Sequence, residues 1–229
     1  MEYSRRVNAV RADPRSRLHE QFARIGKAVA SPRRIELLEL LCQGERSVDA
    51  LAQATGMGIT NVSQHLQTLR AARLVEARRA GTRIYYRAAD EQVCRFASEL
   101  ATVARARLVE VEQIAREHLE GRDALEPVTR QELLARLARR YVLVIDVRPA
   151  EEYRSGHIPG ALSIPLDELA RRLRSLPKTK LIVAYCRGPY CVLAPQALAL
   201  LHARGFRARR LEDGLPEWRA AGLPVASGS

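Results

Sequence analysis

The sequence is poor in the features that mark several classes of protein. Aromatic residues make up only 5% of the chain, which excludes stacking on single-stranded nucleic acid as its main mode of binding. Its apolar runs fall short of the roughly 18–20 residues that a membrane span needs, and no apolar core follows the charged first residues, so we expect neither a membrane anchor nor a signal peptide. Four cysteines scattered over 229 residues do not make a disulfide framework. These absences predict a cytoplasmic protein whose cysteines are reduced.

Lysine is almost missing as well, and arginine carries nearly all of the positive charge. Lysine occurs only at Lys27, Lys178 and Lys180. The formal net charge is nevertheless +12 at pH 7, which favours a polyanionic partner without showing which half of the chain binds it. At 229 residues the chain exceeds the usual size of one domain, about 100–150 residues. We therefore expect two domains, residues 1–120 and 129–229, joined by a linker at 121–128.

The first half has the pattern of three short helices, a two-stranded ribbon and a long helix. Apolar residues at helical spacing, with glycines between the segments, predict helices at 31–43, 47–55 and 60–72. The predicted strands at 74–79 and 82–87 flank a turn at Gly81. A long amphipathic helix at about 91–119 has more apolar surface than a small domain needs, so we expect it to pack against a second copy of the chain.

This order of elements is that of a mainly α-helical winged helix-turn-helix domain, whose second helix fits the major groove of DNA. One side of the helix at 60–72 has short side chains suited to base edges: Thr60, Asn61, Ser63, Gln64 and Gln67. Side chains that reach phosphates lie beside them and on the ribbon: His65, Arg70, Arg78, Arg79 and Arg83. The alternative is a solvated polar face on a small helical bundle. The basic ribbon favours DNA binding.

Several segments of this half carry a family resemblance: Ser31-Pro32-Arg33-Arg34, Val62-Ser63-Gln64-His65-Leu66, Leu69-Arg70, Leu74-Val75, and Gly81 with Tyr85-Tyr86-Arg87. Over about residues 15–120 the chain resembles the ArsR/SmtB family of repressors. The resemblance implies a homodimer, built through the first and last helices, that binds double-stranded operator DNA. Such a repressor blocks a nearby operon until an inducer binds.

Metal-sensing members of that family carry ligands that this chain lacks. They place Cys-x-Cys before the recognition helix or Asp and His pairs on the last helix, whereas 47–55 contains no cysteine and only His118 lies on the last helix. We therefore expect no metal site. Some thiol-responsive members use two cysteines in helices comparable to those of Cys42 and Cys94, and these cysteines are oxidised or bridged by sulfur. The resemblance makes this pair a candidate thiol sensor. The alternative is two buried core cysteines.

In the second half, short apolar runs alternate with helical patterns. Continuous apolar runs at 141–145 and 181–185 predict buried parallel strands, and 206–211 predicts a final strand. The predicted helices begin near Thr129, Asp167 and Val192. This alternation predicts an α/β domain with a parallel central sheet.

Cys186 stands directly after the strand at 181–185, and a short loop leads from it to the next helix. Ligand sites in parallel sheets lie at the carboxyl ends of the strands. Backbone N–H groups of a tight loop and of a helix N-terminus stabilise an anion there. We expect a cysteine in this position to have a lowered pKa and to act as a thiolate nucleophile. The alternative is a buried structural cysteine.

Motifs around this loop also carry a resemblance: Asp146-Val147-Arg148, Glu151-Glu152-Tyr153, Gly156-His157-Ile158-Pro159-Gly160-Ala161, and Asp213-Gly214 with Trp218. Over about residues 128–226 the chain resembles the rhodanese domain. The resemblance implies that Cys186 accepts a sulfane sulfur as a persulfide and passes it to a thiophilic acceptor. The six residues from Cys186 to Cys191 match the loop of sulfur-transferring members, whereas phosphatase and arsenate-reducing relatives have a loop one residue longer.

The sixth position of such loops is often an arginine that helps to hold an anionic donor, whereas this chain has Cys191. Arg187 is left to supply positive charge. Cys191 is a candidate to attack a persulfide on Cys186, which would give a disulfide or a sulfur-bridged pair. The alternative is that Cys191 is only a buried residue at the helix start. The residues expected to support the loop rather than to react are Asp146, Arg148 and Gly188.

Two interpretations of the whole chain follow. The first is a homodimeric repressor of operator DNA whose rhodanese-like domain receives a small sulfur donor. Cys186 takes up the sulfur, Cys191 resolves or shares it, and the modification weakens DNA binding either directly or through Cys42 and Cys94. The second is a sulfurtransferase or thiol-dependent reductase with a small thiol acceptor, in which the winged helix only localises or dimerises the enzyme. Metalloid sensing through Cys186 and Cys191 ranks below both, because two thiols give an incomplete site. We expect no cofactor.

Overall fold

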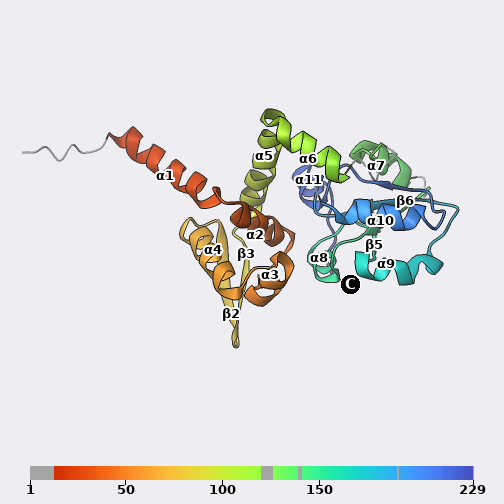
Figure 1. Cartoon of the computed structure of the whole chain (residues 1–229), viewed down its shortest axis with the longest axis horizontal. Helices are drawn as coiled ribbons and strands as arrows, with labels where there is room; N and C mark the ends of the chain where they lie inside the picture. Colours follow the sequence, from red (N-terminus) through yellow and green to blue (C-terminus); the bar gives the residue numbers. More distant parts are fainter. Residues whose placement is uncertain (1–12, 120–125, 139–140, 190, 229) are drawn as a thin grey trace, which may run out of the picture.

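The computed structural model describes residues 13–119, 126–138, 141–189 and 191–228, which form two domains that lie side by side (Figure 1). A winged helix-turn-helix precedes an α/β domain with a parallel sheet, so the predicted fold class is confirmed. Part of the predicted linker, 121–125, lies outside the described residues. Val128, within the same predicted linker, is fully buried in the second domain and its backbone N–H donates to the Arg210 carbonyl at 2.8 Å. Among the described residues, no helix is both long and apolar enough to cross a membrane.

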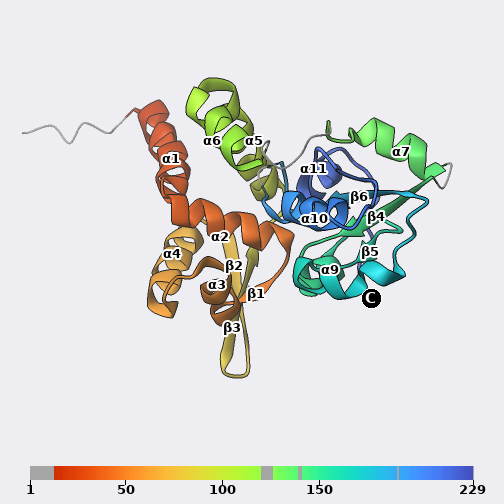
Figure 2. The same ribbon diagram turned by 45° about the vertical axis from the view of Figure 1, so that its right-hand side comes forward.

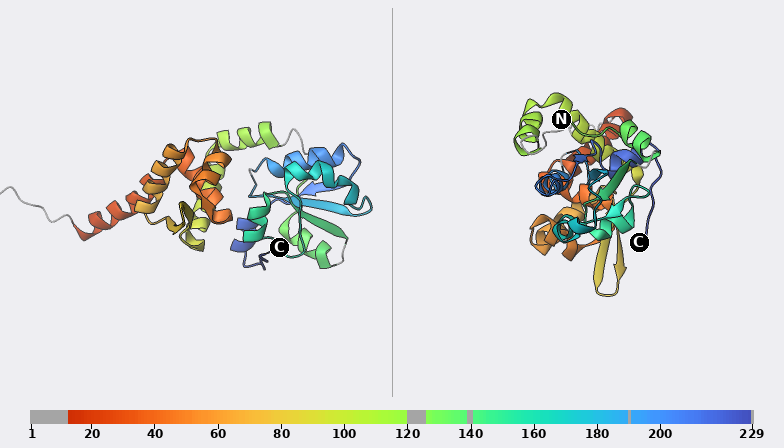
Figure 3. Two further views of the ribbon diagram at one scale, coloured as in Figure 1. Left: turned by 90° about the horizontal axis from the view of Figure 1, so that it is seen from below. Right: turned by 90° about the vertical axis from the view of Figure 1, so that its right-hand side faces the viewer.

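The first domain packs four helices and a three-stranded sheet around one apolar core. Its elements in chain order are α1 (Pro14–Val29), α2 (Pro32–Gln43), β1 (Arg46–Ser47), α3 (Val48–Thr55), α4 (Ile59–Ala71), β2 (Val75–Ala80) and β3 (Arg83–Ala88). Pro32 opens α2, and the Ser47 hydroxyl caps α3 by accepting from the Ala50 N–H at 3.2 Å. Gly56, at a φ of 65°, ends α3 in a left-handed conformation that favours glycine. The β2–β3 wing projects from the body of the domain (Figure 3).

The predicted long helix at 91–119 is wrong as a single element. The structure has α5 (Glu91–Arg107) and α6 (Val109–Leu119), separated at Leu108 by an extended backbone with φ −112° and ψ 107°. Apolar spacing continues across the break, so periodicity alone did not reveal it. None of the 17 residues of α5 is fully buried in this chain.

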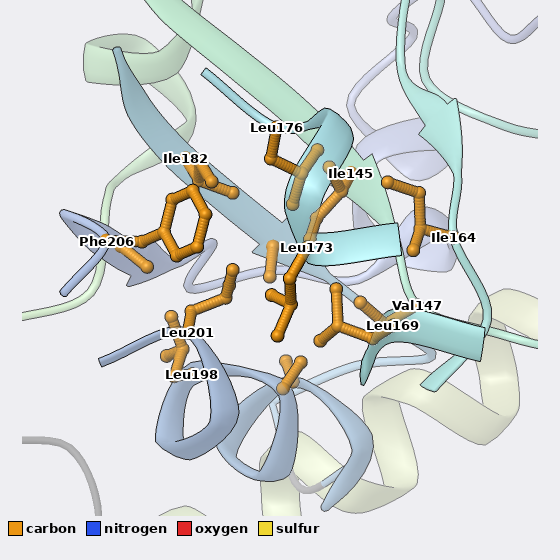
Figure 4. Packing of buried hydrophobic residues seen from close by; sticks show 14 of the residues in the cluster. Ile145, Val147, Ile164, Leu169, Leu173, Leu176, Ile182, Leu198, Leu201 and Phe206 are labelled. Atoms are coloured by element: carbon orange, nitrogen blue, oxygen red, sulfur yellow. The ribbon is translucent and has the colours of Figure 1, made fainter. Parts of the chain in front are cut away.

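The second domain is a four-stranded parallel sheet in the order β5-β4-β6-β7. Its elements are α7 (Arg130–Ala138), β4 (Val142–Asp146), α8 (Ala150–Ser155), β5 (Leu162–Ser163), α9 (Leu166–Arg172), a 3-10 turn (Leu173–Ser175), β6 (Leu181–Tyr185), α10 (Leu193–His202), β7 (Ala208–Arg210) and α11 (Leu215–Ala220). Alternate residues of β4 and β6 enter two cores, one on each face. Figure 4 shows the core that contains Ile145, Leu169 and Leu198, and the other core contains Trp218.

The two domains meet where α11 packs against α2 and α5 (Figure 2). Gly44, just after α2, has a φ of 156°, and a Cβ there would lie 2.5 Å from the Ser155 Oγ of α8. The Ser98 hydroxyl of α5 donates to Glu217 of α11 at 3.2 Å. These contacts bring the end of α2 and the start of α5 to the carboxyl edge of the parallel sheet.

Candidate functional site

The helix α4 turns the predicted DNA-reading residues outward. Its buried side, Val62, Leu66 and Leu69, lies in the core of the first domain. The residues on its exposed or half-buried side are Thr60, Asn61, Ser63, Gln64, His65, Gln67 and Arg70. Their contacts with bases and phosphates stay predictions, and the geometry places them together on one surface.

The wing arginines do not share one environment. Arg79 and Arg83 are exposed near the tip. Arg78 instead donates from Nε to the Glu45 carboxylate at 2.8 Å, and its guanidinium lies 4.9 Å from the centre of the Tyr85 ring. Because Glu45 already holds it, Arg78 is less available for a phosphate than the other two.

The loop at residues 186–191, called here the Cys186 loop, follows β6 as predicted, with residue 190 outside the described residues. The Cys186 side chain is only 3% exposed. The Cys191 N–H donates to the Gly188 carbonyl at 3.1 Å, which closes the turn. The Gly214 turn lies so close that a Cβ on it would be 2.3 Å from the Gly188 nitrogen. The turn residue must therefore be a glycine.

The ionisation of Cys186 differs from the prediction. Burial, and then a hydrogen bond to Cys191, raise the pKa of Cys186 well above its ordinary value. The same hydrogen bond lowers the pKa of Cys191 to about 7, with further help from the backbone N–H groups of Arg187 and Leu193. The predicted lowered pKa of Cys186 is wrong because the end of β6 buries this thiol completely. Cys191, which is half-buried, is the more easily ionised thiol.

Arg187 binds an internal carboxylate and does not point into open solvent. Its Nη2 donates to Glu152 Oε1 at 2.7 Å, and the Glu152 side chain is 1% exposed. Arg46 of β1 donates to the same Oε1 and, at 2.9 Å, to Glu151. Glu152 therefore balances an arginine from each domain. The remaining effect of Arg187 on the loop is electrostatic, since its charge helps to lower the pKa of Cys191.

Asp146 and Arg148 form a fully buried ion pair at the end of β4, with Nη2 and Oδ2 2.6 Å apart. The Tyr185 hydroxyl donates to Asp146 Oδ2 at 2.6 Å, so the pair fixes the residue directly before Cys186. Arg148 Nη1 also donates to Gln43 Oε1 of α2 at 2.9 Å. The pair thus positions the loop through Tyr185, and its contact with Gln43 links the two domains.

Cys42 and Cys94 form a disulfide between α2 and α5, with their Cα atoms 5.5 Å apart. The prediction of reduced cysteines is wrong for this pair, because a separation of 52 residues in the sequence carries no information on distance in the fold. The free thiols among the described residues are Cys186 and Cys191.

A cavity of about 490 Å³ lies between the two domains. Cys42 and Cys94 line it from α2 and α5, and Cys191 and Arg187 line it from the Cys186 loop. Glu217 of α11 also lines it and accepts from the Gly214 N–H at 2.9 Å. The disulfide and one of the two loop thiols, Cys191, therefore border one cavity.

Sequence reasoning missed Gln43, Arg46 and Glu152 as parts of this site. Glu152 lies in a motif that the sequence analysis named, but two adjacent glutamates do not show which of them turns inward. Gln43 and Arg46 carried no signal of their own, because their partners belong to the other domain.

Comparisons with known proteins agree with this architecture. The family model of bacterial regulatory proteins of the arsR family matches residues 31–77, and that of the rhodanese-like domain matches residues 129–221. A sulfurtransferase of Allochromatium vinosum is 34% identical over 87 residues, which are 38% of this chain and 79% of that protein. A solved homodimeric winged helix-turn-helix DNA-binding domain from Mycobacterium bovis is 50% identical, with a TM-score of 0.40, and covers 44% of this chain and 94% of that one.

One relative is similar over nearly the whole length. An HTH-type transcriptional regulator of Mycobacterium tuberculosis is 49% identical over 221 residues, which cover 96% of this chain and 97% of that protein. The similarity therefore includes both domains and their junction. The chain belongs to the arsR family of bacterial regulatory proteins, as a DNA-binding transcriptional regulator that also carries a rhodanese-like domain.

Proposed function

We propose that this regulator is a homodimeric repressor that binds operator DNA less tightly once its rhodanese-like domain has taken up sulfane sulfur. A second copy of the chain is supported by the apolar surface that α1, α5 and α6 leave uncovered. The exposed apolar residues of these helices and of the break between α5 and α6 are Leu18, Phe22, Phe96, Val103, Leu108 and Val109. The helix α5 is amphipathic and has no fully buried residue, so we expect a partner to cover its apolar face.

The observation that carries the proposal is the buried Glu152 carboxylate between the domains. Arg187 reaches it from the Cys186 loop and Arg46 reaches it from β1. The strand β1 pairs with β3 of the wing through Tyr85 and Tyr86. A shift of negative charge at the loop weakens the bond of Arg187 to Glu152, and Glu152 then transmits the change through Arg46 to the strand beside the wing.

The two loop thiols support the sulfur chemistry. Cys191 meets the donor, because it lines the cavity and is the more easily ionised thiol. Its thiolate attacks the terminal sulfur of a low-molecular-weight persulfide or polysulfide, and the remainder of the donor leaves as a thiolate. Cys186 lies beside it, and its S–H donates to the Cys191 carbonyl oxygen at 3.6 Å. The persulfide moves the negative charge of the Cys191 thiolate one sulfur outward, where it competes with Glu152 for the Arg187 guanidinium.

The test is fluorescence anisotropy with DNA from upstream of the gene, at one stated salt concentration, before and after polysulfide treatment. The wild type is expected to bind tightly and to weaken after treatment. The double variant Cys186→Ser/Cys191→Ser is expected to bind equally tightly and not to respond. A double variant that responds like the wild type refutes the role assigned to the loop.

One finding favours a second function, a sulfurtransferase that uses the winged helix only as an anchor: the 34% identity to a sulfurtransferase over 87 residues. Steady transfer of sulfur from polysulfide to an added thiol, without affinity for the upstream DNA, would support that function. The exposed polar face of α4 argues for the repressor, because an enzyme has no need of it.

A further inference from the structure

The helix α8 lies directly beside the small sheet that carries the wing. Arg46 of β1 donates to Glu151 of α8 at 2.9 Å, and β1 pairs with β3 of the wing. In Figure 1, α8 and α9 form the lower side of the second domain, the side toward which the wing projects, and Figure 2 shows the same for α9. The side of the molecule that carries the wing therefore continues onto the second domain.

This continuation is basic. Arg154 of α8, Arg171 of α9 and Arg174 of the 3-10 turn are exposed, and we call these three residues the Arg154 face. None of the three side chains forms an ion pair with another described residue. Asp167, in the first turn of α9, is an exposed carboxylate on the same helix, so positive charge remains in excess. Arginines in this state are available to bind phosphate groups.

The second domain also lies away from the surface assigned to the second copy of the chain. The helix α1, which is part of that surface, lies at the opposite end of the molecule from the second domain (Figure 1). In a dimer that meets through α1, the two second domains therefore lie outside the two wings. DNA that continues beyond the operator lies next to them.

We propose that the Arg154 face binds the phosphate backbone of the DNA that flanks the operator, so that the rhodanese-like domain is a second DNA-binding module. The inference rests on the proposed function for the dimer on its operator, and it does not depend on the sulfur chemistry. Contacts to phosphates carry no sequence information of their own. The Arg154 face therefore adds affinity and salt dependence without adding sequence preference.

The position of Arg154 connects this contact with the junction between the domains. Arg154 and Glu152 belong to the same helix, and Glu152 binds Arg187 of the Cys186 loop and Arg46 of β1. A shift of α8 relative to β1 moves the Arg154 face relative to the wing. The wing and the Arg154 face then no longer fit one duplex equally well, so a change at the junction alters the affinity for long DNA.

The expected effect is large enough to measure. Each arginine–phosphate contact adds about 0.9 to the steepness of log K against log salt. A dimer that lacks both Arg154 and Arg171 in each chain should lose about 3–4 units of this steepness. Between 50 and 200 mM salt, the wild type should therefore lose on the order of 100-fold more affinity for long DNA than the variant loses.

The test is fluorescence anisotropy of the full-length chain with a series of duplexes centred on the upstream operator and shortened in steps from both ends, at two salt concentrations. The wild type is expected to lose affinity and salt dependence when the outer segments are removed. These segments are roughly 10 bp on each side, the reach of a domain of about 100 residues at 3.4 Å per base pair. The variant Arg154→Ala/Arg171→Ala is expected to match the wild type on the shortest duplex, which shows that it is folded, and to gain nothing from longer ones.

The matched control is Arg204→Ala/Arg207→Ala. Both arginines are exposed. The Arg207 carbonyl accepts from the Ile182 N–H at 2.9 Å, which places Arg207 at the start of β6, at the edge of the sheet opposite to the Cys186 loop. The control removes the same charge from the same domain and is expected to keep the dependence on duplex length.

The outcomes separate this inference from the function on which it rests. Wild-type affinity that does not depend on flanking DNA overturns the inference, and so does an equal loss in the Arg154 face variant and in the control, because net charge alone then explains it. A loss that is the same for long and short duplexes also overturns it, because the arginines then act on the operator contact. Dependence on flanking DNA in a chain that ignores polysulfide leaves this inference standing and overturns the sulfur response. A chain without affinity for any upstream duplex overturns both.

Discussion

Replacing Glu152 by glutamine removes the negative charge that lies between Arg46 and Arg187. The Arg46 side chain is 5% exposed and the Glu152 side chain 1% exposed, so water compensates little for the loss. Arg46 also binds Glu151, whose side chain is 59% exposed. Glu151→Gln is the matched control, since it removes a carboxylate from the same arginine at the solvent edge.

The magnitude follows from burial. Removing one partner of a buried ion pair costs about 3–5 kcal/mol, and we expect the lower end, about 3 kcal/mol, because Arg46 keeps Glu151 and Arg187 is 30% exposed. An exposed pair contributes less than about 1 kcal/mol, which sets the expectation for Glu151→Gln. The chain has one tryptophan, Trp218, buried in the second domain, so its fluorescence during urea unfolding reports the free energy of unfolding of that domain.

The free energies of unfolding of the two variants test whether Glu152 holds both arginines. If Glu152→Gln lowers the free energy of unfolding no more than Glu151→Gln does, then Glu152 does not hold the two arginines as described. The coupling between the loop and the wing would lose its physical basis.

Three further predictions concern the loop and the DNA surface. Gly214→Ala places a Cβ 2.3 Å from a backbone nitrogen of the Cys186 loop, so sulfur loading should slow on the order of 100-fold in a stopped-flow assay; an unchanged rate contradicts this. The rate of Cys191 alkylation should increase as pH rises through about 7, where the thiolate forms. The Cys186→Ala variant should move the midpoint of this pH profile upward, because the side chain of Cys186 lowers the pKa of Cys191. An unmoved midpoint shows that Cys186 does not stabilise the thiolate. Arg83→Ala should reduce the salt dependence of DNA binding by about one phosphate contact. Arg78→Ala should change it less, because the Arg78 guanidinium is already paired with Glu45. Equal effects of the two variants argue against the assigned roles.

The first domain could be predicted almost completely from the sequence because its signals are local. Pro32 and Gly56 mark helix ends, and the spacing of Val62, Leu66 and Leu69 marks the buried side of α4. The break at Leu108 was missed for the same reason, since a helical pattern of apolar residues continues through it.

The residues of the site could be predicted, but their electrostatics and partners could not. The prediction that Cys186 follows a buried strand was correct. The pKa of its thiol depends on burial and on Cys191, both of which are tertiary effects. The disulfide of Cys42 with Cys94 and the contact of Gln43 with Arg148 join segments far apart in the chain. No local pattern encodes such distances.

The most direct test of the central claim is the affinity of the wild-type chain for its upstream DNA, measured by anisotropy before and after treatment with a defined amount of polysulfide. The account predicts tight binding that weakens by at least about fivefold, the lower limit of common allosteric coupling, and that recovers when a reductant removes the sulfur. Tight binding that is the same before and after treatment would contradict it.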